Sequence, residues 1–223
     1  MTELLITIDG PAGSGKSSVA KLLAAKLGAA FLDTGAMYRA AALTAMQTGC
    51  DLGDTARLEK VIDSTDFKFE IEAGQMTVKI NNSDATEQIR DPQVTANVRF
   101  VASAPSLRNR LVKMQRAFAA EHEKIVTEGR DQGTVVFPDA DFKIFLTADA
   151  AERAKRRAKE LAEKGHKVDI DKLQQEIENR DRLDSTRKIA PLVAAADAIT
   201  LDTTSLALGQ VVEKILGLIK NND

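Results

Sequence analysis

The segment from residue 10 to residue 17 has the residue types and spacing of a phosphate-binding loop. It reads Gly-Pro-Ala-Gly-Ser-Gly-Lys-Ser and fits the pattern G-x-x-x-x-G-K-[ST]. Its glycines let successive backbone N–H groups converge on one anion, and Lys16 brings a cation to the β- and γ-phosphates of a nucleotide. The Ser17 hydroxyl is a suitable ligand for Mg²⁺. The pattern therefore predicts that the chain binds a nucleoside triphosphate with Mg²⁺.

The segments on either side of this loop support the prediction. Residues 4–8 form an apolar run typical of a buried strand, and residues 17–27 have a helical pattern. A helix that begins at the loop directs the positive end of its dipole at the phosphates. The residues expected to bind ATP are Gly10, Pro11, Ala12, Gly13, Ser14, Gly15, Lys16, Ser17 and Ser18.

Strand and helix patterns alternate along most of the chain. Short apolar, β-branched runs predict strands at residues 4–8, 30–32, 124–127, 142–147 and 198–201. Helical patterns cover residues 17–27, 35–47, 91–103, 106–121, 150–163, 171–183 and 206–220. This alternation predicts an α/β fold with a five-stranded parallel sheet and helices on both faces. Sites in such folds gather at the carboxyl ends of the strands.

Residues 66–86 depart from this pattern. Residues 67–71 and 76–80 alternate between apolar and polar side chains, which predicts a hairpin in a small antiparallel insert. The insert is either a surface hairpin or a flap that closes over a second substrate, and its place in the chain favours the flap. We expect residues 1–223 to form one domain built on the phosphate loop, with the insert near the second substrate and lid helices in residues 150–188.

Arginines are concentrated in the two helices of the expected lid. Arg153, Arg156 and Arg157 share one helix face, which is either a solvated basic surface or a surface that neutralises transferring phosphate. In the next helix the apolar stripe continues to Arg180 and Asp184. A ligand contact is favoured over a buried ion pair, because desolvation offsets most of the attraction within such a pair. Arg187 lies one turn further on and joins this cluster if the helix continues.

Charged residues also follow two of the predicted strands. Thr34 and Arg39 follow the strand at 30–32, and Arg130 and Asp131 follow the strand at 124–127. A guanidinium can hold a phosphate, and a carboxylate beside it can accept a hydrogen bond from a base amine. The alternative for each segment is a capped loop with a surface ion pair. Asp9 and Asp33, at the same strand ends, are candidates for an acidic metal ligand; phosphates and water can supply the remaining ligands.

Composition argues against several classes of protein. The 223 residues carry a net charge of -2 and include no tryptophan, so a nucleic-acid polymer is not an expected partner. No apolar stretch is long enough to span a membrane. The single cysteine, Cys50, excludes a disulfide within the chain. A guanine-reading N-K-x-D segment is absent, which disfavours a GTP-dependent switch. These features are typical of a cytoplasmic protein.

Together these segments resemble the bacterial cytidylate kinases, a family of nucleoside monophosphate kinases. The resemblance rests on residues 8–17, 33–39, 129–134, 143–146, 181–185 and 190–192, and it covers essentially the whole chain. It implies an enzyme, expected to be a monomer, that transfers phosphate from ATP to CMP or dCMP with Mg²⁺. Kinases for another small acceptor, such as another nucleoside monophosphate or a shikimate-like acid, are the nearest alternative.

The resemblance also implies roles for individual residues. Arg39 and Arg130 look like holders of the acceptor phosphate, and Arg153 and Arg157 resemble lid arginines on the donor phosphates. Arg108, Asp131 and Thr34 look like readers of cytosine. Asp184, with Arg180 and Arg187, looks like the contact to the ribose and the adjoining phosphate. At Arg99 the family often has a serine near the base, so this long cation either turns outward or changes the discrimination between pyrimidines.

Overall fold

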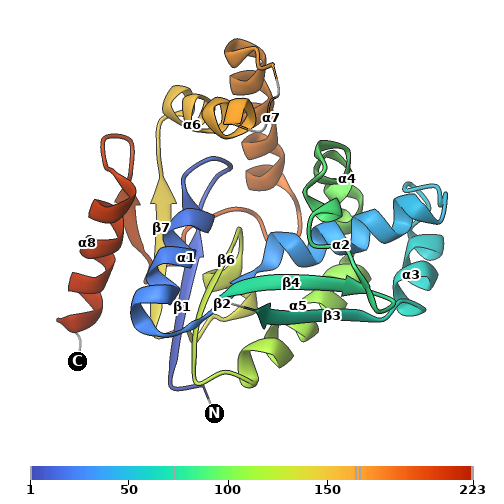
Figure 1. Cartoon of the computed structure of the whole chain (residues 1–223), viewed down its shortest axis with the longest axis horizontal. Coiled ribbons are helices and arrows are strands. Elements are labelled where there is room, and N and C mark those ends of the chain that lie inside the picture. The colour runs from blue at the N-terminus through green and yellow to red at the C-terminus, as the bar shows by residue number, and fades with distance from the viewer. Residues whose placement is uncertain (1, 73, 164, 166, 222–223) are drawn as a thin grey trace. The chain divides into compact units, whose positions relative to one another are not determined.

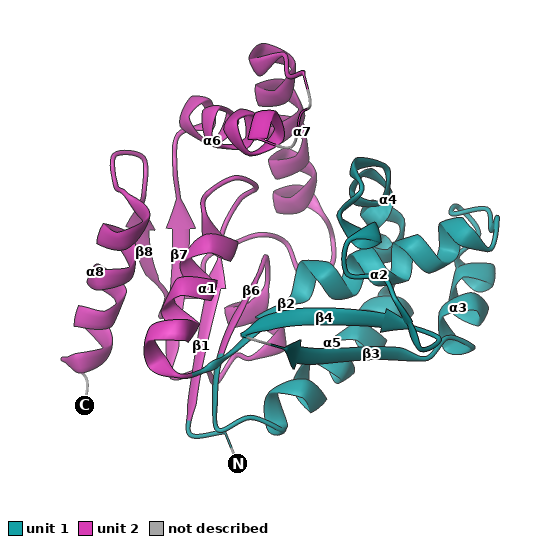
Figure 2. Cartoon of the chain, in the orientation of Figure 1, with its two compact units in different colours: residues 1–3, 29–125 teal, residues 4–28, 126–223 magenta. Residues whose placement is uncertain are grey.

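The computed structural model describes residues 2–72, 74–163, 165 and 167–221. The chain divides into two compact units, which Figure 2 colours separately. Unit 1 comprises residues 1–3 and 29–125, and unit 2 comprises residues 4–28 and 126–223. The expected insert (66–86) and lid (150–188) contain residues 73, 164 and 166, which lie outside the described residues.

The order of the elements confirms the alternation expected from the sequence (Figure 1). The strands are β1 (Leu4–Asp9), β2 (Ala30–Asp33), β3 (Phe67–Glu72), β4 (Gln75–Ile80), β5 (Ser83–Asp84), β6 (Lys124–Gly129), β7 (Phe142–Thr147) and β8 (Ile199–Asp202). The helices are α1 (Lys16–Leu27), α2 (Thr34–Gln47), α3 (Thr55–Asp63), α4 (Pro92–Ser103), α5 (Pro105–Ala120), α6 (Ala150–Glu163), α7 (Ile170–Thr186) and α8 (Leu208–Lys220), with short turns η1 (Gln88–Arg90) and η2 (Gln132–Val136).

The larger sheet is the predicted five-stranded parallel sheet, with the strand order β2-β6-β1-β7-β8. Ile8 of β1 aligns with Ile144 of β7, and Ile144 aligns in turn with Ile199 of β8. Ile6, Ile8 and Ile144 are almost completely buried. Strands that are buried on both faces read as continuous apolar runs, which is why the sequence located them well.

Helices α1 and α8 belong to unit 2 and contact each other. Helix α1 is flanked by Gly15 before its first residue and Gly28 after its last, and both glycines have a left-handed backbone that lets the chain turn sharply there. Its Leu23 and the Ile215 side chain of α8 are fully buried. These contacts fix the direction of α1, whose first turn follows the phosphate loop.

The smaller sheet, in unit 1, is antiparallel with the strand order β3-β4-β5. Phe69 pairs with Val78, and the side chains of Met76, Val78 and Ile80 are buried beside α2. This sheet confirms the hairpin insert. The sequence did not predict β5 or helix α3, because the first is only two residues long and the second has just two buried side chains, Leu58 and Ile62.

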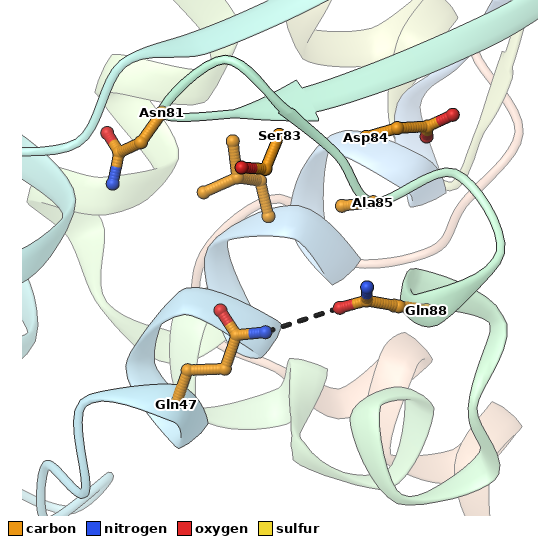
Figure 3. A pocket seen from close by; sticks show the side chains of 7 residues that line it. Gln47, Asn81, Ser83, Asp84, Ala85 and Gln88 are labelled. Atoms are coloured by element: carbon orange, nitrogen blue, oxygen red, sulfur yellow. Dashed lines mark hydrogen bonds between the residues drawn. The ribbon is translucent and has the colours of Figure 1, made fainter.

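A polar cavity of about 340 Å³ lies in unit 1 at the carboxyl end of α2 (Figure 3). Gln47 and Gln88 face each other across it, and the Gln47 Nε2 atom donates a hydrogen bond to Gln88 Oε1 at 3.3 Å. Its lining is formed by Gln47, Ile80, Asn81, Ser83, Asp84, Ala85 and Gln88. Because α2 has fourteen residues, the cavity is about 20 Å from the amino end of that helix, where Thr34 lies.

Helices α6 and α7 pack against each other in unit 2, and Figure 1 shows them beyond the carboxyl end of β7. Helix α6 has the bounds that the sequence predicted. Helix α7 continues to Thr186 instead of ending near residue 183, so Arg187 caps it. No helix in the described part of the chain is both long and apolar enough to cross a membrane.

Candidate active site

The phosphate loop connects β1 to α1 and requires glycine at its first position. Gly10 has a φ of +146°, and a Cβ atom there would lie 2.1 Å from the Leu146 carbonyl oxygen of β7. No side chain can be accommodated so close to a neighbouring backbone. The loop therefore begins at the carboxyl ends of β1 and β7. This is the edge of a parallel sheet at which binding sites form.

Lys16 is folded against this loop. Its side chain is buried, and its Nζ atom donates hydrogen bonds to the Pro11 carbonyl at 2.6 Å and to Ser14 Oγ at 3.5 Å. Burial, together with the positive charges of Arg130 and Arg180, lowers the pKa of Lys16 to about 7, although nearby carboxylates oppose the shift. An ammonium in such surroundings is stabilised by an anion, and phosphate is the anion that this loop is built to hold.

Ser17 and Glu128 form a pair of oxygen ligands that would suit a magnesium ion. Ser17, at the start of α1, donates a hydrogen bond from Oγ to Glu128 Oε1 at 2.5 Å, and Glu128 is a buried residue of β6. Hard oxygen ligands of this kind suit Mg²⁺. Among the described residues there is no group of three His, Cys, Asp or Glu side chains that could hold a metal ion. The pair therefore fits an ion whose other ligands are phosphate and water.

The two aspartates proposed as metal ligands make other contacts. Asp9 accepts hydrogen bonds from the backbone N–H groups of Gln132 at 2.9 Å and Gly133 at 2.8 Å, and so anchors the turn η2 to the end of β1. Burial raises the pKa of Asp9 to about 6, against the effect of these two hydrogen bonds. In unit 1, Asp33 caps α2 and forms an ion pair with Arg39 at 2.9 Å. Sequence reasoning left Glu128 without a role, although its place at a strand end was visible.

Arg153 of α6 contacts the phosphate loop within unit 2. Its Nη1 atom donates a hydrogen bond to the Ala12 carbonyl at 2.9 Å and also bonds to the Asp181 carboxylate. Asp181 in turn accepts a hydrogen bond from the Ala12 N–H at 3.1 Å. The sequence pattern gave no role to Asp181, because nothing in it placed α7 against residue 12.

The other two arginines of α6 lie in different surroundings. Arg156 donates hydrogen bonds to the Thr203 carbonyl at 2.6 Å and to Thr203 Oγ1 at 3.1 Å. Thr203 Oγ1 also contacts the Ser14 carbonyl at 3.3 Å, so Arg156 supports the loop indirectly. Arg157 pairs with Glu160 at 2.8 Å, with 42% of its side chain exposed. The sequence predicted that the three arginines share one helix face, but in the structure their partners differ. Arg153 contacts the phosphate loop, Arg156 contacts Thr203 and Arg157 pairs with Glu160.

A second cluster in unit 2 joins the end of β6 to α7. Arg130 Nε donates a hydrogen bond to Asp184 Oδ2 at 3.0 Å, and Arg187 Nη1 lies 4.0 Å from Asp184 Oδ1. Arg180 is close enough for its charge to lower the pKa of Lys16. Asp131 is buried, and its charge contributes to the raised pKa of Asp9. The structure therefore brings Arg130 and Arg180 near Lys16 of the phosphate loop, and it joins Arg130 and Arg187 through Asp184.

Three predicted acceptor residues belong to unit 1. Thr34 is buried in the first turn of α2, and Arg39 lies on the same helix. The Arg39 Nε atom is buried without a hydrogen-bond partner among the described residues. Arg108 of α5 is buried with its guanidinium carbon 5.7 Å from the centre of the Tyr38 ring. Arg99 is exposed and stacks on Phe100, with 4.8 Å between its guanidinium carbon and the ring centre.

The parallel sheet, the phosphate loop and its buried lysine define a P-loop kinase fold with an anion site. Solved structures with this fold include a shikimate kinase from Acinetobacter baumannii in complex with shikimate, at a TM-score of 0.50 and 16% identity over 100% of this chain and 96% of the other. An uncharacterized protein from Eubacterium ventriosum matches with a TM-score of 0.52 and 14% identity over 99% of both chains. At these identities the likeness extends to the fold alone.

Sequence comparison identifies the family within this class. The family model described as "Cytidylate kinase" matches residues 6–221. A cytidylate kinase from Pelotomaculum thermopropionicum is 48% identical over 96% of this chain and 95% of its own length. One from Caldicellulosiruptor saccharolyticus is 46% identical over 98% of this chain and 96% of its own. The chain belongs to the cytidylate kinase family, as the resemblance of its motifs indicated.

Proposed function

We propose that this protein transfers the γ-phosphoryl group of ATP to CMP or dCMP, giving ADP and CDP or dCDP. The observation that carries the proposal is the buried Lys16 ammonium on the phosphate loop, surrounded by the charges of Arg130 and Arg180. Burial and these two cations together outweigh the nearby Glu128 and Asp9 carboxylates, so the Lys16 ammonium is stabilised when an anion binds. The chain's membership of the cytidylate kinase family supports CMP as the acceptor.

The reaction requires alignment and charge neutralisation more than covalent chemistry by the protein. The acceptor phosphate oxygen is already a nucleophile, so no strong general base is needed. In this proposal Lys16 binds the β- and γ-phosphates, and Arg153 stabilises charge on the transferring group. Arg157 would join it only if its side chain leaves Glu160. Mg²⁺, when bound beside Ser17 and Glu128, supplies further positive charge at the phosphates.

Acceptor binding is assigned to the residues that the resemblance of the motifs implies. Arg39, whose buried Nε atom has no partner among the described residues, and Arg130 would hold the CMP phosphate. Thr34, Arg108 and Asp131 would read cytosine. Asp184, with Arg180 and Arg187, would bind the ribose hydroxyls and the adjoining phosphate. The insert at 66–86 is proposed as a flap near the acceptor, and residues 150–188 as the lid.

An acceptor panel tests the proposal directly. ADP release is measured with ATP, Mg²⁺ and one of CMP, dCMP, UMP, AMP or shikimate, and hydrolysis is measured with no acceptor. We expect CMP and dCMP to give the highest kcat/KM. A higher value with shikimate or AMP would contradict the assigned acceptor. Rapid hydrolysis without any acceptor would instead favour a nucleotide-dependent switch.

Oligomeric state and location are part of the same proposal. We propose a monomer that works in the cytoplasm, where its nucleotide substrates are found. Sedimentation equilibrium should give the mass of one chain, 24.1 kDa, with and without nucleotides. A concentration-dependent dimer would contradict the monomer, and recovery of the protein in a membrane or extracellular fraction would contradict the location.

A further inference from the structure

Both backbone polar groups of Ala12 in the phosphate loop, its N–H and its carbonyl, form hydrogen bonds to side chains of the proposed lid. The Ala12 N–H donates to Asp181 Oδ1 at 3.1 Å, and the Ala12 carbonyl accepts from Arg153 Nη1 at 2.9 Å. Arg153 Nη1 also donates to Asp181 Oδ2. The three residues form a closed ring of hydrogen bonds that joins α6, α7 and the loop within unit 2.

Other contacts restrict the Arg153 guanidinium further. Its Nε atom donates to the Ala148 carbonyl at 2.9 Å, and only 8% of its side chain is exposed. A Cβ atom on Gly13 would lie 3.1 Å from Arg153 Cβ, so glycine lets the start of α6 pack directly on the loop. The guanidinium cannot turn without breaking several hydrogen bonds, and Asp181 is its carboxylate partner in this network.

We propose that Asp181 is a positioning residue for phosphoryl transfer: its carboxylate orients the Arg153 guanidinium at the phosphate loop. The inference rests on the proposed function, in which Arg153 stabilises the transferring phosphoryl group. Charged donors are most effective when they are aligned before the reaction, because no energy is then spent on reorienting them. A carboxylate beside an anion-binding loop also repels the phosphates of ATP. Asp181 should therefore favour the chemical step and oppose nucleotide binding, which a purely structural ion pair would not do.

The isosteric variant Asp181→Asn separates these two effects. Asn keeps an acceptor for the Ala12 N–H but loses the anionic oxygen that faces Arg153. We expect kcat to fall about tenfold while the Kd of ATP stays unchanged or becomes tighter. The control is Glu178→Gln on the same helix, which alters an exposed carboxylate bonded to Gln174 at 2.8 Å and should behave as wild type. Weaker ATP binding together with a lower melting temperature would overturn the proposal.

A double-mutant cycle tests whether Asp181 acts through Arg153. Arg153→Ala should lower kcat, and adding Asp181→Asn should then have no further effect. An equal loss from Asp181→Asn in both backgrounds would overturn the positioning role but leave the catalytic role of Arg153 standing. A wild-type kcat for Arg153→Ala would contradict both. Asp181→Glu, which retains the charge, should recover part of kcat and provides a second variant if Asp181→Asn folds poorly.

Nuclear magnetic resonance gives a readout that does not depend on activity. The signals of the Ala12 amide and the Arg153 Nε–H group should shift in Asp181→Asn and remain in place in Glu178→Gln. Both groups belong to the hydrogen-bonded network around Asp181, so unchanged signals would mean that this network does not form in solution and would overturn the proposal.

Discussion

At the scale of single residues, Asp131 offers the sharpest test of base selection. Cytosine carries an amine where uracil carries a carbonyl, so a carboxylate accepts a hydrogen bond from one base and repels the other. Asp131 is 95% buried, and such a carboxylate interacts strongly with whatever faces it. Its proposed role as a reader of cytosine follows from this chemistry and from its place after β6.

We predict that Asp131→Asn lowers the preference for CMP over UMP by about tenfold, measured as the ratio of kcat/KM values. The KM of ATP should remain within about twofold of wild type, because the altered contact belongs to the acceptor base. Melting temperatures of the two proteins check that the buried substitution leaves the fold intact. An unchanged ratio in a folded variant would argue that another residue reads the base.

Asp9 makes the stability of the protein sensitive to pH. Its pKa is raised from 3.8 to about 6, mainly by burial, and the Asp131 carboxylate adds to this shift while Lys16 opposes it. Between pH 3.8 and about pH 6 the folded protein therefore binds more protons than the unfolded chain. The contribution of Asp9 to the free energy of unfolding falls as pH rises through this range. Above about pH 7 the contribution becomes constant.

We predict that the unfolding free energy of wild type, compared with that of Asp9→Asn, decreases by about 2–3 kcal/mol between pH 4 and pH 6.5. Urea unfolding at several pH values measures this difference. Asp139→Asn, at an exposed position, is the matched control and should show no such trend. A difference that is flat, or that rises with pH, would contradict the raised pKa of Asp9.

At the scale of elements, the junction of β1 with the phosphate loop has no room for a side chain. A Cβ atom at Gly10 would meet the Leu146 carbonyl at 2.1 Å, whereas one at Gly28, after α1, would meet nothing within 4 Å. Both glycines have positive φ, at +146° and +62°. The pair therefore separates the cost of a backbone clash from the cost of an unfavourable backbone conformation.

We predict that Gly10→Ala destabilises the protein by more than about 3 kcal/mol and abolishes ATP binding, because β1 and β7 must separate. Gly28→Ala should cost only about 1 kcal/mol and leave ATP binding unchanged. Denaturant unfolding and nucleotide titration measure the two effects. Similar losses in both variants would mean that conformation, rather than the clash at Leu146, determines the requirement.

The sequence predicted the large sheet and its helices because each strand is an apolar run and each helix has a clear period. It could not predict η2, where residues 132–136 form a π-helical turn, because that turn depends on hydrogen bonds to Asp9 from 123 and 124 residues away. The contact of Asp181 with Ala12 was missed for the same reason. The phosphate-loop pattern is local, whereas the side chains around it come from distant strand ends and helices.

At the scale of the whole molecule, similarity of fold and similarity of sequence identify different properties of the protein. The shikimate kinase from Acinetobacter baumannii shares the fold across the full length of this chain at 16% identity, so the fold does not specify the acceptor. Cytidylate kinases match over nearly the same length at 45–48% identity. This likeness assigns the chain to the cytidylate kinase family rather than to another kinase family with the same fold. The motifs of the sequence indicate the same family, and they are spread over the whole chain.

Metal dependence is expected to affect the reaction and not the fold. Ser17 and Glu128 bond to each other, and the described residues contain no three-ligand acidic cluster. We predict that a chelator abolishes phosphoryl transfer but changes the melting temperature by less than about 2 °C, and that Mg²⁺ stabilises the protein mainly when ATP is also present. Thermal denaturation with each addition measures this. A large stabilisation by Mg²⁺ alone would indicate a resident metal site instead.

The order of the strands also has a consequence for synthesis on the ribosome. β1 ends at Asp9, whereas its neighbour β7 begins at Phe142, so residues 10–141 must be made after β1 before that pairing can form. Nascent chains stalled before this point should not retain ATP, and the ability to do so should emerge only after β7 has left the exit tunnel. Until β6 and β7 have both been made, β1 lacks one or both of its neighbours in the sheet, which is when a chaperone would be of most use to it.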